Sequence, residues 1–174
     1  MIRRFFSALI LLVFICASAY AEPLPGLVRL QVVAESDGAD AQALKLELRD
    51  VCLRAAEICL ADAPDADAAY ARLCSHLDDF QAACEARARE LGCGAEVRAE
   101  AGVFDFPDRV YGKLFVPAGE YRALRVIVGA GEGHNWWCVL YPSLCVLNET
   151  EAAGEPDAAG ILDWLRIRWG GDGA

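Results

Sequence analysis

Apolar and polar residues alternate along residues 27–34 near the start of the chain. One face of this segment carries the side chains of Val28, Leu30, Val32 and Ala34. A period of two residues is typical of a strand that buries one face. Small polar residues at positions 36–40 interrupt the alternation and favour the start of a helix. We therefore predict a half-buried strand followed by a helix.

From residue 40 the apolar period lengthens to three or four residues, which is typical of a helix with one buried stripe. The stripe consists of Ala41, Leu44, Leu48, Val51, Ala55 and Ile58. Pro64 ends this helix. A second stripe consists of Tyr70, Leu73, Leu77, Phe80 and Cys84, and Gly92 provides a helix end. The short link between the two stripes predicts an antiparallel helical hairpin.

After the helices the period returns to two residues. Residues 97–103 alternate, residues 106–108 form a predicted turn, and residues 111–116 and 121–129 read as two strands around a loop. The order β-α-α-β-β-β predicts an α+β fold. In that fold an antiparallel sheet of about four strands carries the antiparallel helical hairpin on one face.

The two ends of the chain differ from this central region. Residues 1–21 combine two arginines, an apolar run and a small-x-small motif, which predicts a signal peptide that is cleaved after Ala21. The alternative is that the segment is retained as an anchor. Residues 148–174 predict an acidic flexible tail with a short amphipathic end. Residues 22–147 then form a single domain.

The net charge of the chain argues against one class of partner. The formal net charge is −10, and removal of the two arginines of the signal peptide lowers it to −12. An acidic domain does not attract nucleic acid, so we expect no nucleic-acid partner.

Seven cysteines remain after cleavage, and in an exported chain they can form disulfides. Cys52 and Cys74 lie at equal distances from the predicted interhelix turn, so a bridge between them is one interpretation. The alternative is that both are small buried thiols. Cys138 and Cys145 are separated by six residues and are predicted to close a small loop. The partners of the other cysteines stay open.

Residues 131–145 read GEGHNWWCVLYPSLC and concentrate unusual chemistry. His134 and Cys138 are candidates for the base and nucleophile of an envelope hydrolase. Their spacing of four suits a helix, which the neighbouring glycines disfavour. His134, Cys138 and Cys145 could supply three zinc ligands, but their spacing matches no standard zinc site, so the stretch does not predict zinc. We expect no metal and no cofactor.

The preferred interpretation of this stretch is a binding loop closed by its two cysteines. Tryptophan and tyrosine are enriched in protein-binding hot spots and at membrane interfaces. The predicted contact residues are Asn135, Trp136, Trp137, Leu140, Tyr141, Pro142 and Leu144. Two alternatives are that a tryptophan caps the core and that the loop contacts a membrane surface.

Three blocks between residues 28 and 147 carry a family resemblance. The first holds Arg29-Leu30, residues 33–37, Gln42, Leu44-Lys45 and Arg49-Asp50. The second holds Phe106-Pro107, Tyr111-Gly112, residues 117–121 and Ala123-Leu124. The third holds Gly129, Gly131, Gly133, residues 135–139 and residues 142–145. Together they resemble the stage II sporulation protein R family, and the third block is the most specific.

The resemblance implies a developmental signal and not an enzyme. Such proteins are made in the forespore and exported into the space between the forespore and mother-cell membranes. There they activate a membrane-embedded aspartic protease in the mother-cell membrane, which cleaves the precursor of sigma factor E. The resemblance therefore implies that this protease is the partner of the chain.

Overall fold

The computed structural model describes residues 23–111 and 114–142, which contain six strands and three helices. In chain order they are β1 (Val28–Val33), α2 (Ala39–Leu60), α3 (Ala66–Ser75), α4 (Leu77–Glu90), β2 (Val97–Phe106), β3 (Arg109–Tyr111), β4 (Leu114–Val116), β5 (Gly119–Val128) and β6 (Asn135–Tyr141). The predicted signal peptide, the predicted tail and the domain boundary at residue 147 lie outside the described residues.

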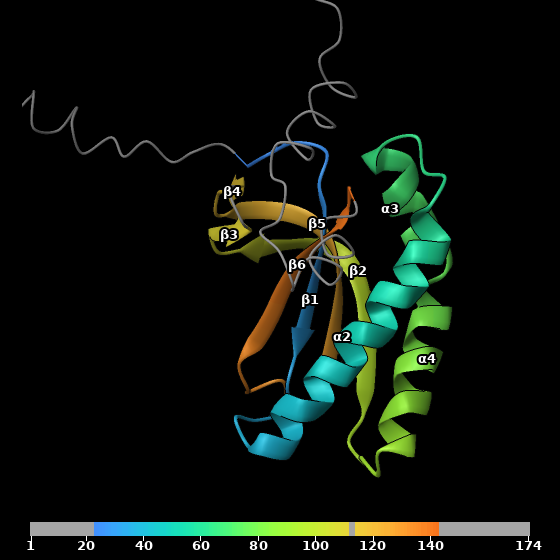
Figure 1. Ribbon diagram of the computed structural model, residues 1–174, viewed down its shortest axis with the longest axis vertical. Coiled ribbons are helices and arrows are strands. Elements are labelled where there is room, and N and C mark those ends of the chain that lie inside the picture. Colours follow the sequence, from blue (N-terminus) through green and yellow to red (C-terminus); the bar gives the residue numbers. More distant parts are fainter. Residues whose placement is uncertain (1–22, 112–113, 143–174) are drawn as a thin grey trace, which may run out of the picture.

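Four strands form one sheet in the order β2-β5-β1-β6, and β3 pairs with β4 in a separate hairpin (Figure 1). The predicted α+β class and order are confirmed. The sheet is mixed, however, because β1 runs parallel to β5 while its other pairings are antiparallel. A purely antiparallel sheet was expected from strands that reverse along the chain. Instead, β5 lies between β2 and β1 and runs parallel to β1.

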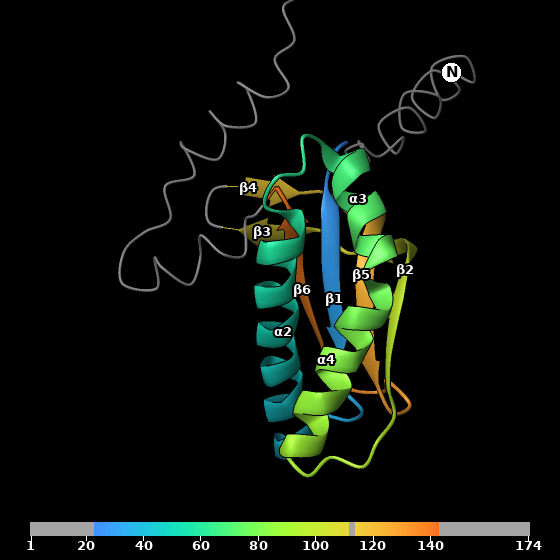
Figure 2. The ribbon, with the colours of Figure 1, turned by 90° about the vertical axis from the view of Figure 1, so that its right-hand side faces the viewer.

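Helices α2 and α4 lie side by side over one face of the sheet (Figure 2). The main core lies between them and the strands. The predicted inward face of β1 is confirmed, since Val28, Leu30 and Val32 are almost completely buried in the main core, and Leu124, Val126 and Val128 of β5 are buried there as well. All six residues of β1 are buried, however, so the prediction of a half-buried strand was wrong. Alternation along these strands thus determines which side of the sheet receives the helices.

A second, smaller core lies on the opposite face of the sheet. Its buried members are Leu27, Phe106, Leu114, Val116, Tyr121, Ala123 and Val139. The β3–β4 hairpin covers this core at one end of the sheet (Figure 1). Residues 111–116, predicted as a single strand, therefore contribute to two short strands that pack on the sheet without joining it.

The second predicted helix is divided in two at His76, whose φ of −111° and ψ of 17° are not helical. This break makes the predicted Cys52–Cys74 bridge wrong. Both cysteines are free thiols, Cys52 is buried and Cys74 is exposed. The prediction assumed one unbroken helix opposite α2, whereas α4 sets the pairing and places Cys84 beside Cys52.

Candidate partner-binding surface

A glycine-rich turn leads from β5 into the predicted binding loop. Gly131 has a φ of 68°, which glycine adopts without steric cost. At Gly133 an added Cβ would lie 2.3 Å from the backbone oxygen of Ser36. The Gly133 N–H also donates to the Ala34 carbonyl at 2.9 Å. These contacts bring the returning chain directly against the end of β1.

The predicted binding loop is a strand in this structure. Residues 135–141 form β6, which pairs with β1 along its whole length and aligns Val32 with Trp136 and Val28 with Tyr141. The loop prediction was wrong because the apolar run completes the sheet beside β1. A strand of this kind satisfies backbone groups of β1 that a loop would leave unpaired.

The two tryptophans point to opposite faces of the sheet, and both are half-buried. Trp136 packs against the main core, with the guanidinium carbon of Arg49 5.3 Å from its ring centroid. Trp137 packs against the second core, and its ring centroid lies 4.9 Å from that of Phe106 in an edge-to-face arrangement. Each tryptophan therefore contributes to a core as well as to the surface.

Three predicted contact residues are not available to a partner. Leu140 and Tyr141 are each 4% exposed, and Pro142 is buried. They were predicted as contacts of a closed loop, whereas Leu140 and Tyr141 are buried in β6 and Pro142 is buried directly after it. Asn135 is half-buried, and Leu144 and Cys145 lie outside the described residues. Cys138 is not one of the free thiols, but its predicted pairing with Cys145 stays a prediction.

The exposed apolar side chains near β6 belong instead to the β3–β4 hairpin. Leu114 and Val116 face the second core, while Val110 and Phe115 lie opposite each other on the outer face. Val110 is 66% exposed and Phe115 is 51% exposed. The sequence offered a signal, since strands 109–111 and 114–116 lack the polar alternation expected of a half-buried strand.

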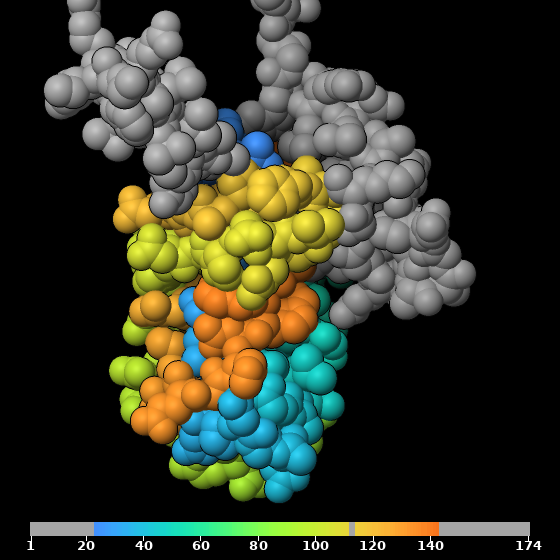
Figure 3. All heavy atoms as spheres, turned by 90° about the vertical axis from the view of Figure 1, so that its left-hand side faces the viewer, coloured from blue at the N-terminus to red at the C-terminus, as the bar shows by residue number. Residues whose placement is uncertain are grey.

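The hairpin adjoins β6, as the yellow and orange surfaces in Figure 3 show. The guanidinium carbon of Arg109 lies 5.8 Å from the ring centroid of Trp137 and links the two elements. We call Arg109, Val110, Phe115 and Trp137 the hairpin surface. It combines exposed apolar groups, a cation and an aromatic ring, which are the groups that protein interfaces favour.

A buried arginine holds the hairpin in place. The Arg29 side chain is completely buried, and its guanidinium carbon lies 4.3 Å from the Phe106 ring centroid and 5.0 Å from that of Tyr121. Its Nη2 donates to the Tyr111 hydroxyl at 2.8 Å, while Nε and Nη1 have no hydrogen-bond partner among the described residues. Burial lowers the pKa of Arg29 and raises the pKa of Tyr111.

The candidate hydrolase pair is not assembled. The His134 ring pairs with the Asp37 carboxylate, and the His134 backbone N–H donates to the same oxygen at 2.7 Å. Cys138 is buried in the main core. Four residues along extended chain span about 13 Å, whereas a nucleophile and its base must lie within hydrogen-bond reach. The arrangement does not support a thiol nucleophile at this position.

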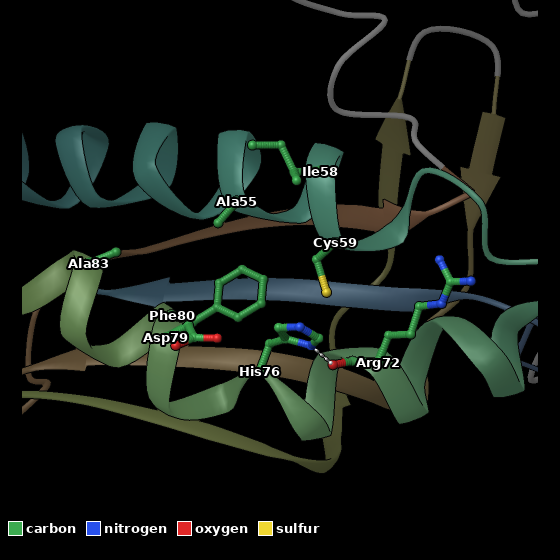
Figure 4. A pocket seen from close by; sticks show the side chains of 8 residues that line it. All are labelled: Ala55, Ile58, Cys59, Arg72, His76, Asp79, Phe80 and Ala83. Atoms are coloured by element: carbon green, nitrogen blue, oxygen red, sulfur yellow. Dashed lines mark hydrogen bonds between the residues drawn. The ribbon is translucent and has the colours of Figure 1, made fainter.

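A second place with thiol and imidazole groups lies between α2 and the junction of α3 and α4. Its cavity of about 580 Å³ is lined by Ala55, Ile58, Cys59, Arg72, His76, Asp79, Phe80 and Ala83. In Figure 4 the Cys59 sulfur points toward the His76 ring, which hydrogen-bonds the Arg72 carbonyl. Burial raises the pKa of Cys59, the opposite of what a nucleophilic cysteine needs.

No group of three or more histidine, cysteine or acidic side chains in residues 23–111 and 114–142 could hold a metal ion. Within the same ranges, no helix has the length and apolar character that crossing a membrane requires.

Comparison with known proteins covers nearly the whole described region. The family model for stage II sporulation protein R matches residues 25–151. The chain belongs to this family. Its match includes every strand and helix from β1 to β6, so the hairpin surface lies within the family's domain. Membership of the stage II sporulation protein R family gives the chain a role in sporulation, and no catalytic family is indicated.

A named relative agrees with this assignment. The chain is 32% identical over 121 residues to the stage II sporulation protein R of Bacillus subtilis (strain 168). The alignment covers 70% of this chain and 54% of the relative, so the chain spans about half of the relative's length. No solved structure matches the chain.

Proposed function

We propose that the protein is an exported developmental signal of sporulation. It leaves the forespore and reaches the space between the forespore and mother-cell membranes. There it activates a membrane-embedded aspartic protease of the mother-cell membrane, and that protease processes the precursor of sigma factor E. Family membership supports the sporulation role. The predicted signal peptide in residues 1–21 supports export.

The observation that carries the proposed contact is the exposed apolar pair on the hairpin. Val110 and Phe115 lie opposite each other and are more than half exposed, although the hairpin has a buried inner face. The fold does not require apolar residues at these two positions, because both side chains lie on the outer face of the hairpin. Contiguous exposed apolar groups on a folded domain mark interaction sites. We assign the partner protease to the hairpin surface.

A contact with the lipid surface is the competing occupant. Anionic headgroups repel a chain whose formal net charge is −10. The hairpin surface contributes one cation, Arg109, which is too little to reverse that repulsion. Vesicles of anionic and of neutral phospholipid distinguish the two occupants. A protein partner predicts that neither vesicle retains the chain at physiological salt.

The decisive experiment changes the apolar pair in sporulating cells. The double variant Val110→Ser and Phe115→Ser should abolish processing of the sigma factor precursor because it removes the exposed apolar contact. Ile58→Ser is the matched control, since Ile58 is 83% exposed and lies on α2 over the other face of the sheet. Equal amounts of folded chain must be verified for each variant by immunoblot and limited proteolysis.

Two results would contradict the assignment. Normal processing in the double variant would remove the hairpin surface from the mechanism. Loss of processing in Ile58→Ser as well would show that exposed apolar groups act through export or stability and not through a specific contact.

The predicted bridge between Cys138 and Cys145 has its own role in this proposal. A bridge would tie Cys138 of β6 to Cys145. Cys138→Ser and Cys145→Ser should then reduce processing to the same extent. A loss confined to Cys138→Ser would instead contradict the bridge, because Cys138 is buried in the main core and its replacement by serine disturbs packing there without any pairing.

A further inference from the structure

Two cysteines in the main core lie in contact across two helices. Cys52 of α2 and Cys84 of α4 have completely buried side chains, and their sulfur atoms are 3.5 Å apart. The other free cysteines among the described residues, Cys59, Cys74 and Cys93, are half-buried or exposed. No function described above uses the buried pair.

The surrounding contacts fix the relative position of the two helices. Arg87 of α4 donates from Nη2 to the Glu47 carboxylate of α2 at 2.7 Å. Between the two helices, both thiols are packed by the main core. A disulfide has an S–S length of about 2.05 Å, so roughly 1.5 Å of approach between the sulfur atoms is needed. Small side-chain rotations supply such a movement without separating the helices.

We propose that Cys52 and Cys84 form a disulfide that joins α2 to α4. The oxidant is a disulfide of a thiol–disulfide oxidoreductase or of a small thiol. One cysteine thiolate attacks a sulfur of the oxidant, forms a mixed disulfide and releases the first oxidant thiol. The second cysteine thiolate then displaces the remaining oxidant thiol. The chain loses two hydrogen atoms, and the oxidant is reduced to two thiols.

The bridge forms before the core closes. In the folded chain, the hydrogen bond between Cys52 and Cys84 and the burial of the Cys52 side chain raise the pKa of Cys52 well above the ordinary value of a thiol. The attacking species in exchange is the thiolate, and a closed core also keeps the oxidant out. An unfolded chain therefore reacts readily, while a folded chain with reduced thiols reacts slowly. This makes the bridge a record of the environment in which the chain folded.

The closed loop spans residues 52–84 and contains α3 together with the break at His76. Cross-linking a loop of this length restricts the unfolded chain and stabilises the native state. For a domain of this size the melting temperature of the oxidised form should exceed that of the reduced form by about 10 °C.

The test is oxidative refolding of the full chain in a buffer of reduced and oxidised glutathione. Free thiols are alkylated after refolding, and unreduced peptides are identified by mass spectrometry. Trypsin leaves Cys74 and Cys84 on one peptide, residues 73–87, whereas a second cleavage after Asp78 or Asp79 separates them. The expected product is a cross-link between the Cys52 peptide and the Cys84 peptide. Alkylated Cys52 and Cys84 in the refolded chain would overturn the proposal.

Two variants keep the result interpretable. The triple variant Cys59→Ala, Cys74→Ala and Cys93→Ala retains the buried pair and should keep both the cross-link and the difference in melting temperature. Cys52→Ala should lose both, while Cys59→Ala, on the same helix, should lose neither. If Cys52→Ala does not fold, the triple variant still decides the question through its cross-link. A Cys52 cross-link to any other cysteine would also overturn the proposal.

Discussion

The Arg29 guanidinium donates a hydrogen bond of 2.8 Å to the Tyr111 hydroxyl and thereby ties the central strand β1 to the β3–β4 hairpin. The hairpin carries the exposed pair Val110 and Phe115, so this one bond connects the buried sheet to the proposed contact surface. Two other nitrogen atoms of Arg29 have no hydrogen-bond partner within residues 23–111 and 114–142. The tie therefore depends on the tyrosine hydroxyl and on the aromatic rings around the guanidinium.

Tyr111→Phe should destabilise the domain by about 1–3 kcal/mol, because it leaves a third nitrogen atom of a buried cation without an acceptor. Urea unfolding measures the change. In a chain that already carries Arg29→Met, the same tyrosine change should cost much less, since no buried donor is left unsatisfied. Equal costs in the two backgrounds would show that the hydrogen bond does not couple the two residues.

Trp137→Ala should lower the free energy of unfolding by about 2 kcal/mol, because the ring packs edge-to-face on Phe106 in the second core. Phe115→Ala should change it by no more than about 0.5 kcal/mol, since that ring is mostly exposed. Urea unfolding compares the two variants. The reverse ranking would mean that the hairpin's outer face is buried in solution. Tryptophan replacement alone therefore cannot separate binding from folding, which is why the functional test uses the hairpin pair.

Asp37 should make a pH-dependent contribution to stability. Hydrogen bonds from the His134 ring and backbone lower the pKa of Asp37 below its ordinary value of 3.8. The folded state thus favours the carboxylate, so the contribution is present above pH 3.8 and is lost as the pH falls through the lower folded-state pKa. Urea midpoints of the native chain and of Asp37→Asn should differ at neutral pH and converge in acid. A constant difference across that range would refute the linkage.

Gly133→Ala should destabilise the domain by about 1–3 kcal/mol through a clash of the new methyl group with the backbone of Ser36. Hydrogen exchange should report the loss first at the amides between β1 and β6. Gly94→Ala is the control, because an added Cβ there meets no atom of the described residues within 4 Å apart from its chain neighbours. Similar effects of the two substitutions would argue against the close approach.

Local periodicity predicted the helix from residue 40, its end near Pro64 and the inward face of β1. The buried stripe of that helix was predicted only in part, because Ile58 is 83% exposed and the buried face continues through Cys52, Ala56 and Leu60. The break at His76 was not predicted, because the apolar stripe of the second helix continues through it. Because of that single non-helical residue, the cysteine that contacts Cys52 is Cys84 and not Cys74.

The candidate site was harder to predict because its key relationships are long-range. Residues 135–141 have the composition of a binding loop, and only their pairing with β1 reveals a strand. The hairpin surface depends on which face of residues 109–116 meets the second core, and single-sequence spacing does not specify that face. The family, in contrast, was predicted from motifs in the sequence, and the comparison confirmed the family.

The position of β1 has a consequence for how the chain assembles. It is the first strand of the described chain, yet its two partners, β5 and β6, are the last strands of that chain. All six of its residues are buried in the finished sheet. Until residue 141 is available for pairing, β1 has at least one edge with unpaired backbone groups, and such an edge promotes aggregation. The sheet therefore closes only when nearly the whole domain is available for pairing, because the partners of β1 lie at the far end of the described chain.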